Sequence, residues 1–239
     1  MLTTGDTMNR RFLLSAALAA AACGGDRTPP AADTPAPAPA PAAPAPAPIQ
    51  ALPDVMLRGT AHLEPSLTFR SCETRTIISA LDSTGGRLVS TYRLLQASNE
   101  AGMYVLVRGV TAPNGTVIFR EVEYASQPSA TEGCDQTPSG VIAARGVGPD
   151  WHLEISSSGI QFTRGAEPPI TFPAVTPSGS GGSIRYEVPA APGAPHTLQL
   201  DLSRAACNVG AKFTYAAMQA SLVIDGKAIR GCAWRTRLP

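Results

Sequence analysis

Cysteine is the residue type in this chain with the most chemistry to offer, and its number is odd. Five cysteines occur among 239 residues, at positions 23, 72, 134, 207 and 232. A thiol can be acylated, oxidised to a disulfide or deprotonated to hold a metal ion. Because four cysteines can pair among themselves, the fifth needs an explanation of its own.

The first cysteine closes an N-terminal segment typical of exported proteins. Met8-Asn9-Arg10-Arg11 is a short basic stretch, and an apolar run over residues 12–22 follows it. This run is too short to span a bilayer, which takes about 20 helical residues. This pattern predicts a signal peptide over residues 1–22. Ala20-Ala21-Ala22-Cys23-Gly24-Gly25 resembles the lipobox of bacterial lipoproteins, in which the cysteine is acylated.

The lipobox resemblance implies that acyl chains such as palmitate on Cys23 hold the chain in a lipid bilayer. Each buried methylene contributes about 0.8 kcal/mol, so several chains anchor firmly where one does not. Gly24 in place of aspartate implies sorting to the outer membrane, with the chain facing the periplasm. An ordinary cleaved signal with an incidental Cys23 is the alternative.

The other four cysteines predict two disulfides. Four cysteines allow three pairings, and we expect the economical one, Cys72–Cys134 and Cys207–Cys232, within the two halves of the folded part. Exported compartments permit such bonds. A metal site is the rival, but the sequence has no CxxC and no histidine spaced to join a cysteine. We therefore predict no metal site and no cofactor.

Catalytic constellations are weak in this sequence. His62-Leu63-Glu64 and His152-Leu153-Glu154 repeat a tripeptide whose outer residues share a face of a strand, but exposed strand positions explain both. Glu121 and Glu123 could likewise hold a cation, and solubility at a sheet edge is the simpler role. There is no G-x-S-x-G elbow, and the Gly-Ser run 178–183 lacks the lysine of a phosphate-binding loop. We predict no catalytic residue and no enzyme.

Composition excludes some partners and indicates a spacer. The net charge of +1 with only 15% charged residues argues against nucleic-acid binding, which needs a basic surface. Removing residues 1–22 takes away Arg10, Arg11 and Asp6, which leaves 17 basic and 17 acidic side chains. Residues 23–53 hold the lipidated cysteine and an alternating Pro-Ala stretch. Because each proline fixes φ, we predict an extended, disordered tether.

Beyond residue 53, short apolar runs alternate with turn signals, so we predict an all-β fold. Alternation over 183–188 and 197–202 is typical of antiparallel strands with one buried face. Short helices are expected only over 92–97 and 213–219. The pattern indicates two small antiparallel β domains, residues 54–135 and 141–238. Domains of under 100 residues bury a smaller share of their surface on folding than larger domains do, and we expect one disulfide in each to add stability.

The first of these domains resembles a known family of envelope proteins. The segments Phe69–Thr74, Tyr92–Leu95, Tyr104–Gly109 and Gly133-Cys134 follow the order cysteine, short helix, strand, cysteine. They resemble the C-terminal OB-like domain of NlpE-type envelope-stress and copper-homeostasis lipoproteins. The resemblance implies an OB-like barrel and a place in envelope homeostasis.

The second domain resembles the C-terminal domain of uncharacterised bacterial envelope lipoproteins. The matching segments are Ala144–Trp151, Ala206–Asn208, Ile224–Lys227 and Gly231–Ala233. This resemblance implies a β-barrel or sandwich and no reaction.

Together these patterns predict a non-enzymatic binding, sensing or structural module in cell-envelope homeostasis. Its expected partners are the bilayer, through acylated Cys23, and an envelope protein, with no nucleic acid. The alternative is an inhibitor of an envelope-directed hydrolase such as lysozyme, with an exposed loop entering the enzyme's cleft. The candidate binding-loop residues are Gly179, Ser180, Gly181, Gly182, Asn208, Val209 and Gly210.

Overall fold

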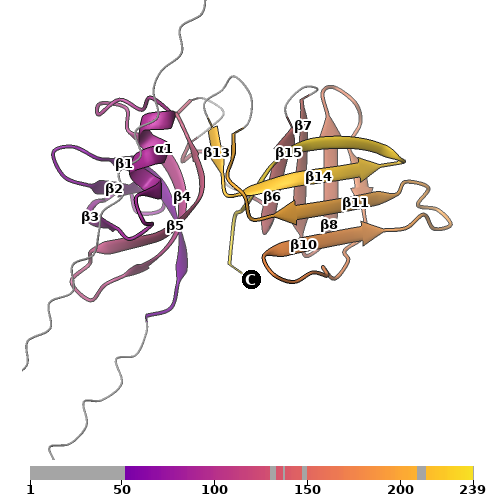
Figure 1. The fold of residues 1–239 in the computed structure, drawn as a ribbon, viewed down its shortest axis with the longest axis horizontal. Coiled ribbons are helices and arrows are strands. Elements are labelled where there is room, and N and C mark those ends of the chain that lie inside the picture. Colours follow the sequence, from indigo (N-terminus) through magenta and orange to yellow (C-terminus); the bar gives the residue numbers. More distant parts are fainter. Residues whose placement is uncertain (1–51, 130–132, 137, 147–149, 209–213, 239) are drawn as a thin grey trace, which may run out of the picture. The chain divides into compact units, whose positions relative to one another are not determined.

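In the part of the chain that the structure describes, strands carry almost all the regular structure, as the sequence predicts, and one short helix completes it (Figure 1). The computed structural model describes residues 52–129, 133–136, 138–146, 150–208 and 214–238. The predicted signal peptide, Cys23, the tether to residue 51, Val209 and Gly210 lie outside the described residues. Among those described, no helix has the length and apolar character needed to cross a membrane.

The first five strands close into the predicted OB-like barrel. β1 pairs with β2 and β4, β2 with β3, β3 with β5, and β5 with β4. The β3–β5 pairing is parallel, whereas the others are antiparallel as expected. The strands are β1 (Val55–His62), β2 (Thr68–Ser71), β3 (Ile77–Asp82), β4 (Met103–Thr111) and β5 (Val117–Ser126).

The helix between β3 and β4 begins earlier than expected. α1 spans Arg87–Leu94, whereas the sequence pattern predicted a helix over residues 92–97. Gly86, with φ of 82°, reverses the chain immediately before it. Leu88, Tyr92 and Leu95 are buried at i, i+4 and i+7, so the apolar face of the helix starts at Leu88. The predicted helix starts too late because the prediction placed the beginning of this buried stripe about one turn after Leu88.

Eight further strands form a second sheet that is antiparallel throughout, in the order β10-β11-β14-β15-β6-β7-β8-β9. The predicted Asp-Gly hairpin joins β14 to β15, and both turn residues have positive φ. The strands are β6 (Ile142–Gly146), β7 (Trp151–Ser156), β8 (Gly159–Arg164), β9 (Ile170–Phe172), β10 (Ser183–Val188), β11 (Leu198–Ser203), β14 (Met218–Ile224) and β15 (Lys227–Arg235).

The predicted alternation decides which face of the second sheet is buried. In β11, Leu198, Leu200 and Leu202 enter the core, while Gln199 and Ser203 point to the other face. Trp151, Phe162 and Leu222 belong to the same core. The outer face of β10, β11, β14 and β15 is consequently polar.

Two short strands from the C-terminal half join the first sheet. β12 (Cys207–Asn208) pairs with β13 (Thr214–Ala216), and β13 pairs with β5. The helix expected over 213–219 is therefore wrong, because residues 214–216 and 218–219 lie in strands. Adding to the edge of β5 satisfies their backbone groups and buries Tyr215 and Ala216. Strands from both predicted domains share this sheet, and the division into 54–135 and 141–238 stays a prediction.

Both predicted disulfides, Cys72–Cys134 and Cys207–Cys232, are present. The second joins β12 of the first sheet to β15 of the second. A small apolar cluster lies beside it, in which the rings of Tyr124 from β5 and Trp234 from β15 are 4.4 Å apart. The Cys207–Cys232 bond therefore ties the two sheets together covalently.

Replacing Cys207 and Cys232 by alanine should lower the free energy of unfolding by about 3–4 kcal/mol. The bond closes a 25-residue separation, and opening it restores conformational entropy to the unfolded chain. Guanidinium unfolding of the double variant and of the oxidised wild type measures this difference. Reduced wild type is the control, and it should lose more stability because both disulfides open. An unchanged unfolding midpoint in the double variant would contradict the assigned role.

Candidate functional site

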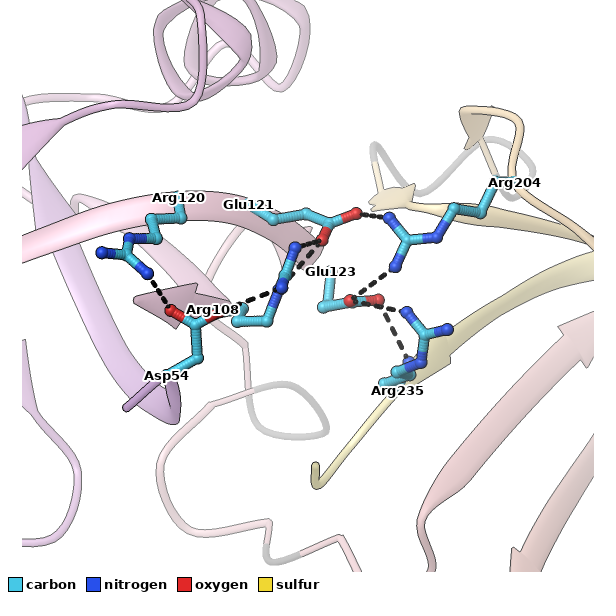
Figure 2. A network of polar contacts seen from close by, with 7 residues as sticks. All are labelled: Asp54, Arg108, Arg120, Glu121, Glu123, Arg204 and Arg235. Carbon is cyan, nitrogen blue, oxygen red and sulfur yellow. Dashed lines mark hydrogen bonds and ion pairs between the residues drawn. The ribbon is translucent and has the colours of Figure 1, made fainter. Parts of the chain in front are cut away.

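Seven charged side chains form a continuous network between strands of the two sheets (Figure 2). Asp54 precedes β1, Arg108 lies on β4, and Arg204 follows β11. The others lie on β5 and β15. The members are Asp54, Arg108, Arg120, Glu121, Glu123, Arg204 and Arg235.

Arg108 lies between two carboxylates. Its Nε and Nη2 donate to Oε2 of Glu121, at 3.1 and 2.5 Å, and its Nη1 donates to Oδ2 of Asp54 at 3.0 Å. Arg120 donates to the second oxygen of Asp54 at 2.6 Å. Arg204 donates to the second oxygen of Glu121. Both oxygens of Glu121 are therefore occupied by guanidinium groups.

Glu123 is the buried member of the network, with a fully inaccessible side chain. Its Oε1 lies 3.3 Å from Nη1 of Arg235 and 3.9 Å from Nη2 of Arg204, and its Oε2 accepts the backbone N–H of Arg235 at 3.4 Å. A role in solubility at a sheet edge is therefore wrong for Glu123. Its oxygens are also paired with arginines, so it is not placed as a cation ligand.

Two irregularities in the β4–β5 pairing aim these side chains. The register shifts between Leu106 and Val107, and again between Arg108 and Gly109. Glu123 and Arg120 are consequently left without a partner residue on β4. A β-bulge redirects side chains and increases local twist. Sequence alternation alone could not place these two charges, because the bulges break the period of two.

A second candidate site is a pocket of about 950 Å³ on the polar outer face of β10, β11, β14 and β15. The predicted loop residues Gly179 and Ser180 line it, and so does Cys207, the neighbour of the predicted Asn208. Gly181, Gly182 and Asn208 are exposed but are not among the lining residues. The structure thus places part of the first predicted loop at this concave surface, whereas Asn208 of the second lies beside it and outside the lining.

The strand register arranges the polar groups of this pocket in rows. Arg185 lies opposite Asp201, Asp201 opposite Ser221, and Ser221 opposite Arg230. Arg185 Nε donates to Asp201 at 2.5 Å, and this hydrogen bond raises the pKa of Arg185 and lowers the pKa of Asp201. Arg230 forms no ion pair with a described residue. It remains a free cation at the pocket, since arginine stays charged at ordinary pH.

The two His-Leu-Glu tripeptides behave differently. His62 contacts the backbone oxygen of Asn99 instead of Glu64, whereas His152 pairs with Glu154 at 3.1 Å. Partial burial acts to raise the pKa of Glu154, but hydrogen bonds from Ser139 and His152 lower it overall. In the described ranges, no three His, Cys, Asp or Glu side chains gather in a way that could hold a metal ion.

Comparison of the chain with protein-family models, curated proteins and solved structures found no match.

Replacing Glu123 by alanine should destabilise the fold by about 3–5 kcal/mol, because it leaves Arg235 without its buried counter-charge and takes from Arg204 one of its two carboxylate partners. Urea unfolding measures the change. Glu123→Gln keeps the shape and should cost less. Glu187→Ala is the control, since Glu187 is exposed on β10, and it should stay within about 0.5 kcal/mol of wild type. If the Glu123→Ala and Glu187→Ala variants unfold alike, the network does not hold the sheets.

Proposed function

We propose that this chain is a lipid-anchored, periplasm-facing lipoprotein of the outer membrane, acting as a non-enzymatic binding module in cell-envelope homeostasis. The observation that carries the proposal is the pocket of about 950 Å³ on the outer face of β10, β11, β14 and β15. Its size lies within the range of small-ligand sites, about 300–1,000 Å³. Gly179 and Ser180, from a loop singled out in the sequence, line it.

The chemistry of the pocket favours binding over catalysis. Its polar groups are mainly hydroxyls, an amide and arginines: Ser178, Ser180, Ser183, Ser203, Ser221, Gln219, Arg185 and Arg230. The carboxylate of Asp201 is held by Arg185 and Gln199, so it is not placed to act as a free base. Cys207 and Cys232 are joined in a disulfide and offer no thiolate nucleophile.

The same groups indicate the class of ligand. Hydroxyls and amides bind hydroxyls and amides, and the free guanidinium of Arg230 suits a carboxylate. An extended envelope polymer that carries all three groups, of which peptidoglycan is the natural example, fits this lining. The strand rows would let such a polymer lie across β10, β11, β14 and β15.

The expected lipid anchor and the two disulfides support the assignment of the protein to an exported compartment. The lipobox resemblance at Cys23 implies acylation and attachment to a bilayer. Two disulfides, one of them with the fully buried Cys232, are typical of proteins that fold in oxidising, exported compartments.

The conformation of the Gly-Ser loop weighs against the alternative of a hydrolase inhibitor. Ser178 and Arg185 exchange two backbone hydrogen bonds, of 2.9 and 2.7 Å. This pairing closes the loop over the edge of β10, where Gly179 and Ser180 line the pocket. A loop that enters an enzyme's cleft needs to project from the surface, whereas this one forms the wall of a depression.

Cys23→Ala should abolish incorporation of a fatty-acid probe and release the protein from the membrane fraction, because the anchoring thiol is gone. Metabolic labelling followed by fractionation measures both effects. Cys72→Ala is the matched control and should keep the label. Undiminished labelling of Cys23→Ala would overturn the lipoprotein assignment.

Purified residues 52–239 should sediment with isolated peptidoglycan, and Arg230→Glu should weaken this binding about tenfold, the cost of losing one charged hydrogen bond. Lys227→Glu makes the same charge change on β15 outside the pocket and should bind as wild type does. Equal loss in both variants would indicate unspecific charge attraction.

In the same preparation, lysozyme should keep its activity at micromolar excess of this protein. Inhibition would favour the inhibitor function over the binding module.

A further inference from the structure

We propose that a second pocket, distinct from the peptidoglycan-binding surface, binds a dianionic phosphate monoester. The pocket, of about 400 Å³, lies where α1 begins and where β4 and β5 meet residue 204 and β13. Four arginines, 87, 108, 120 and 204, line it together with Glu121 and Tyr215. Planar guanidinium groups match phosphate oxygens in shape and charge.

The charges around this pocket do not cancel. Its lining has four guanidinium groups and, through Glu121, one carboxylate. Including the rest of the Figure 2 network adds Arg235, Asp54 and Glu123. Five positive charges then face three negative ones, an excess of two. A phosphate monoester carries a charge of about −1.5 to −2 at pH 7, which matches this excess.

The carboxylate of Glu121 in the lining does not prevent an anion from binding. Both oxygens of Glu121 already accept hydrogen bonds from Arg108 and Arg204, so these two arginines compensate its negative charge. Arg87 is different, because it is exposed and forms no ion pair with a described residue. It is the cation left over to meet a ligand.

Electrostatics within the protein point the same way. Partial burial lowers the pKa of Arg204, and the positive charges of Arg235 and Arg108 lower it further. Arg235 and Arg108 therefore lie close enough to repel the charge of Arg204. A bound anion would relieve that repulsion.

Two further donors border the pocket. Arg87 is the first residue of α1, whose first turn has no acidic side chain, so the positive end of the helix dipole is unopposed there. Burial raises the pKa of Tyr215, which keeps its phenol protonated and able to donate a hydrogen bond. Arginine, helix terminus and phenol together resemble the donor sets that hold phosphate groups.

The test uses the full chain in mild non-ionic detergent, with calorimetric titration of inorganic phosphate and of glycerol 1-phosphate at matched ionic strength. We expect saturable binding of both, with the monoester at least as tight. Dihexanoyl-phosphatidylglycerol, a soluble phosphodiester lipid, separates the sources of phosphate and should bind more weakly because it carries a single charge. Tighter binding of this lipid than of inorganic phosphate or glycerol 1-phosphate would overturn the proposal.

Arg87→Ala should weaken phosphate binding about tenfold and leave the unfolding midpoint unchanged, because the Arg87 side chain is exposed and forms no ion pair with a described residue. Arg93→Ala removes the same charge from an exposed position on α1 and should stay near wild type. Arg230→Glu should also bind phosphate normally, so this proposal and the peptidoglycan proposal can fail separately. Absence of saturable phosphate binding, or equal loss in Arg87→Ala and Arg93→Ala, would disprove the site.

Discussion

The buried carboxylate of Glu123 is the constraint on which the arrangement of the two sheets depends. A carboxylate removed from water is costly unless cations and hydrogen-bond donors meet it. Its partners come from distant parts of the chain, Arg204 after β11 and Arg235 at the end of β15. The β4–β5 bulge that turns Glu123 inward is therefore stable only when the C-terminal strands supply these arginines. The other ion pairs of the network extend from this contact.

The path of the chain meets this constraint with three kinds of interaction. After β11 the chain leaves the second sheet, adds β12 and β13 to the first, and returns to the second as β14. Backbone hydrogen bonds join β13 to β5, the Cys207–Cys232 bond joins β12 to β15, and stacked Tyr124 and Trp234 fill the space beside it. The strand pairing, the disulfide and the apolar contact are largely independent of salt. The exposed ion pairs of the charge network are screened by salt, so they contribute most at low ionic strength.

Local patterns in the sequence predicted local features well. Period-two alternation identified β10 and β11, the Asp-Gly pair identified the β14–β15 turn, and pairing the four remaining cysteines within each half of the folded part predicted both disulfides. The start of α1 was missed by one turn, because its buried stripe begins at Leu88. The charge network had no readable signal, since Glu121 and Arg204 are 83 residues apart and the bulges that aim Arg120 and Glu123 follow from packing.

Overall neutrality and local charge are separate properties of this protein. Equal numbers of acidic and basic side chains after residue 22 argue against the broad positive surface that a polyanion such as nucleic acid requires. They do not prevent five arginines from gathering around three carboxylates in one place. Because such a local field falls off within about 10 Å at ordinary salt, a small anion inside the pocket would lie wholly within it, whereas most of a polyanion spread over the surface would lie beyond it.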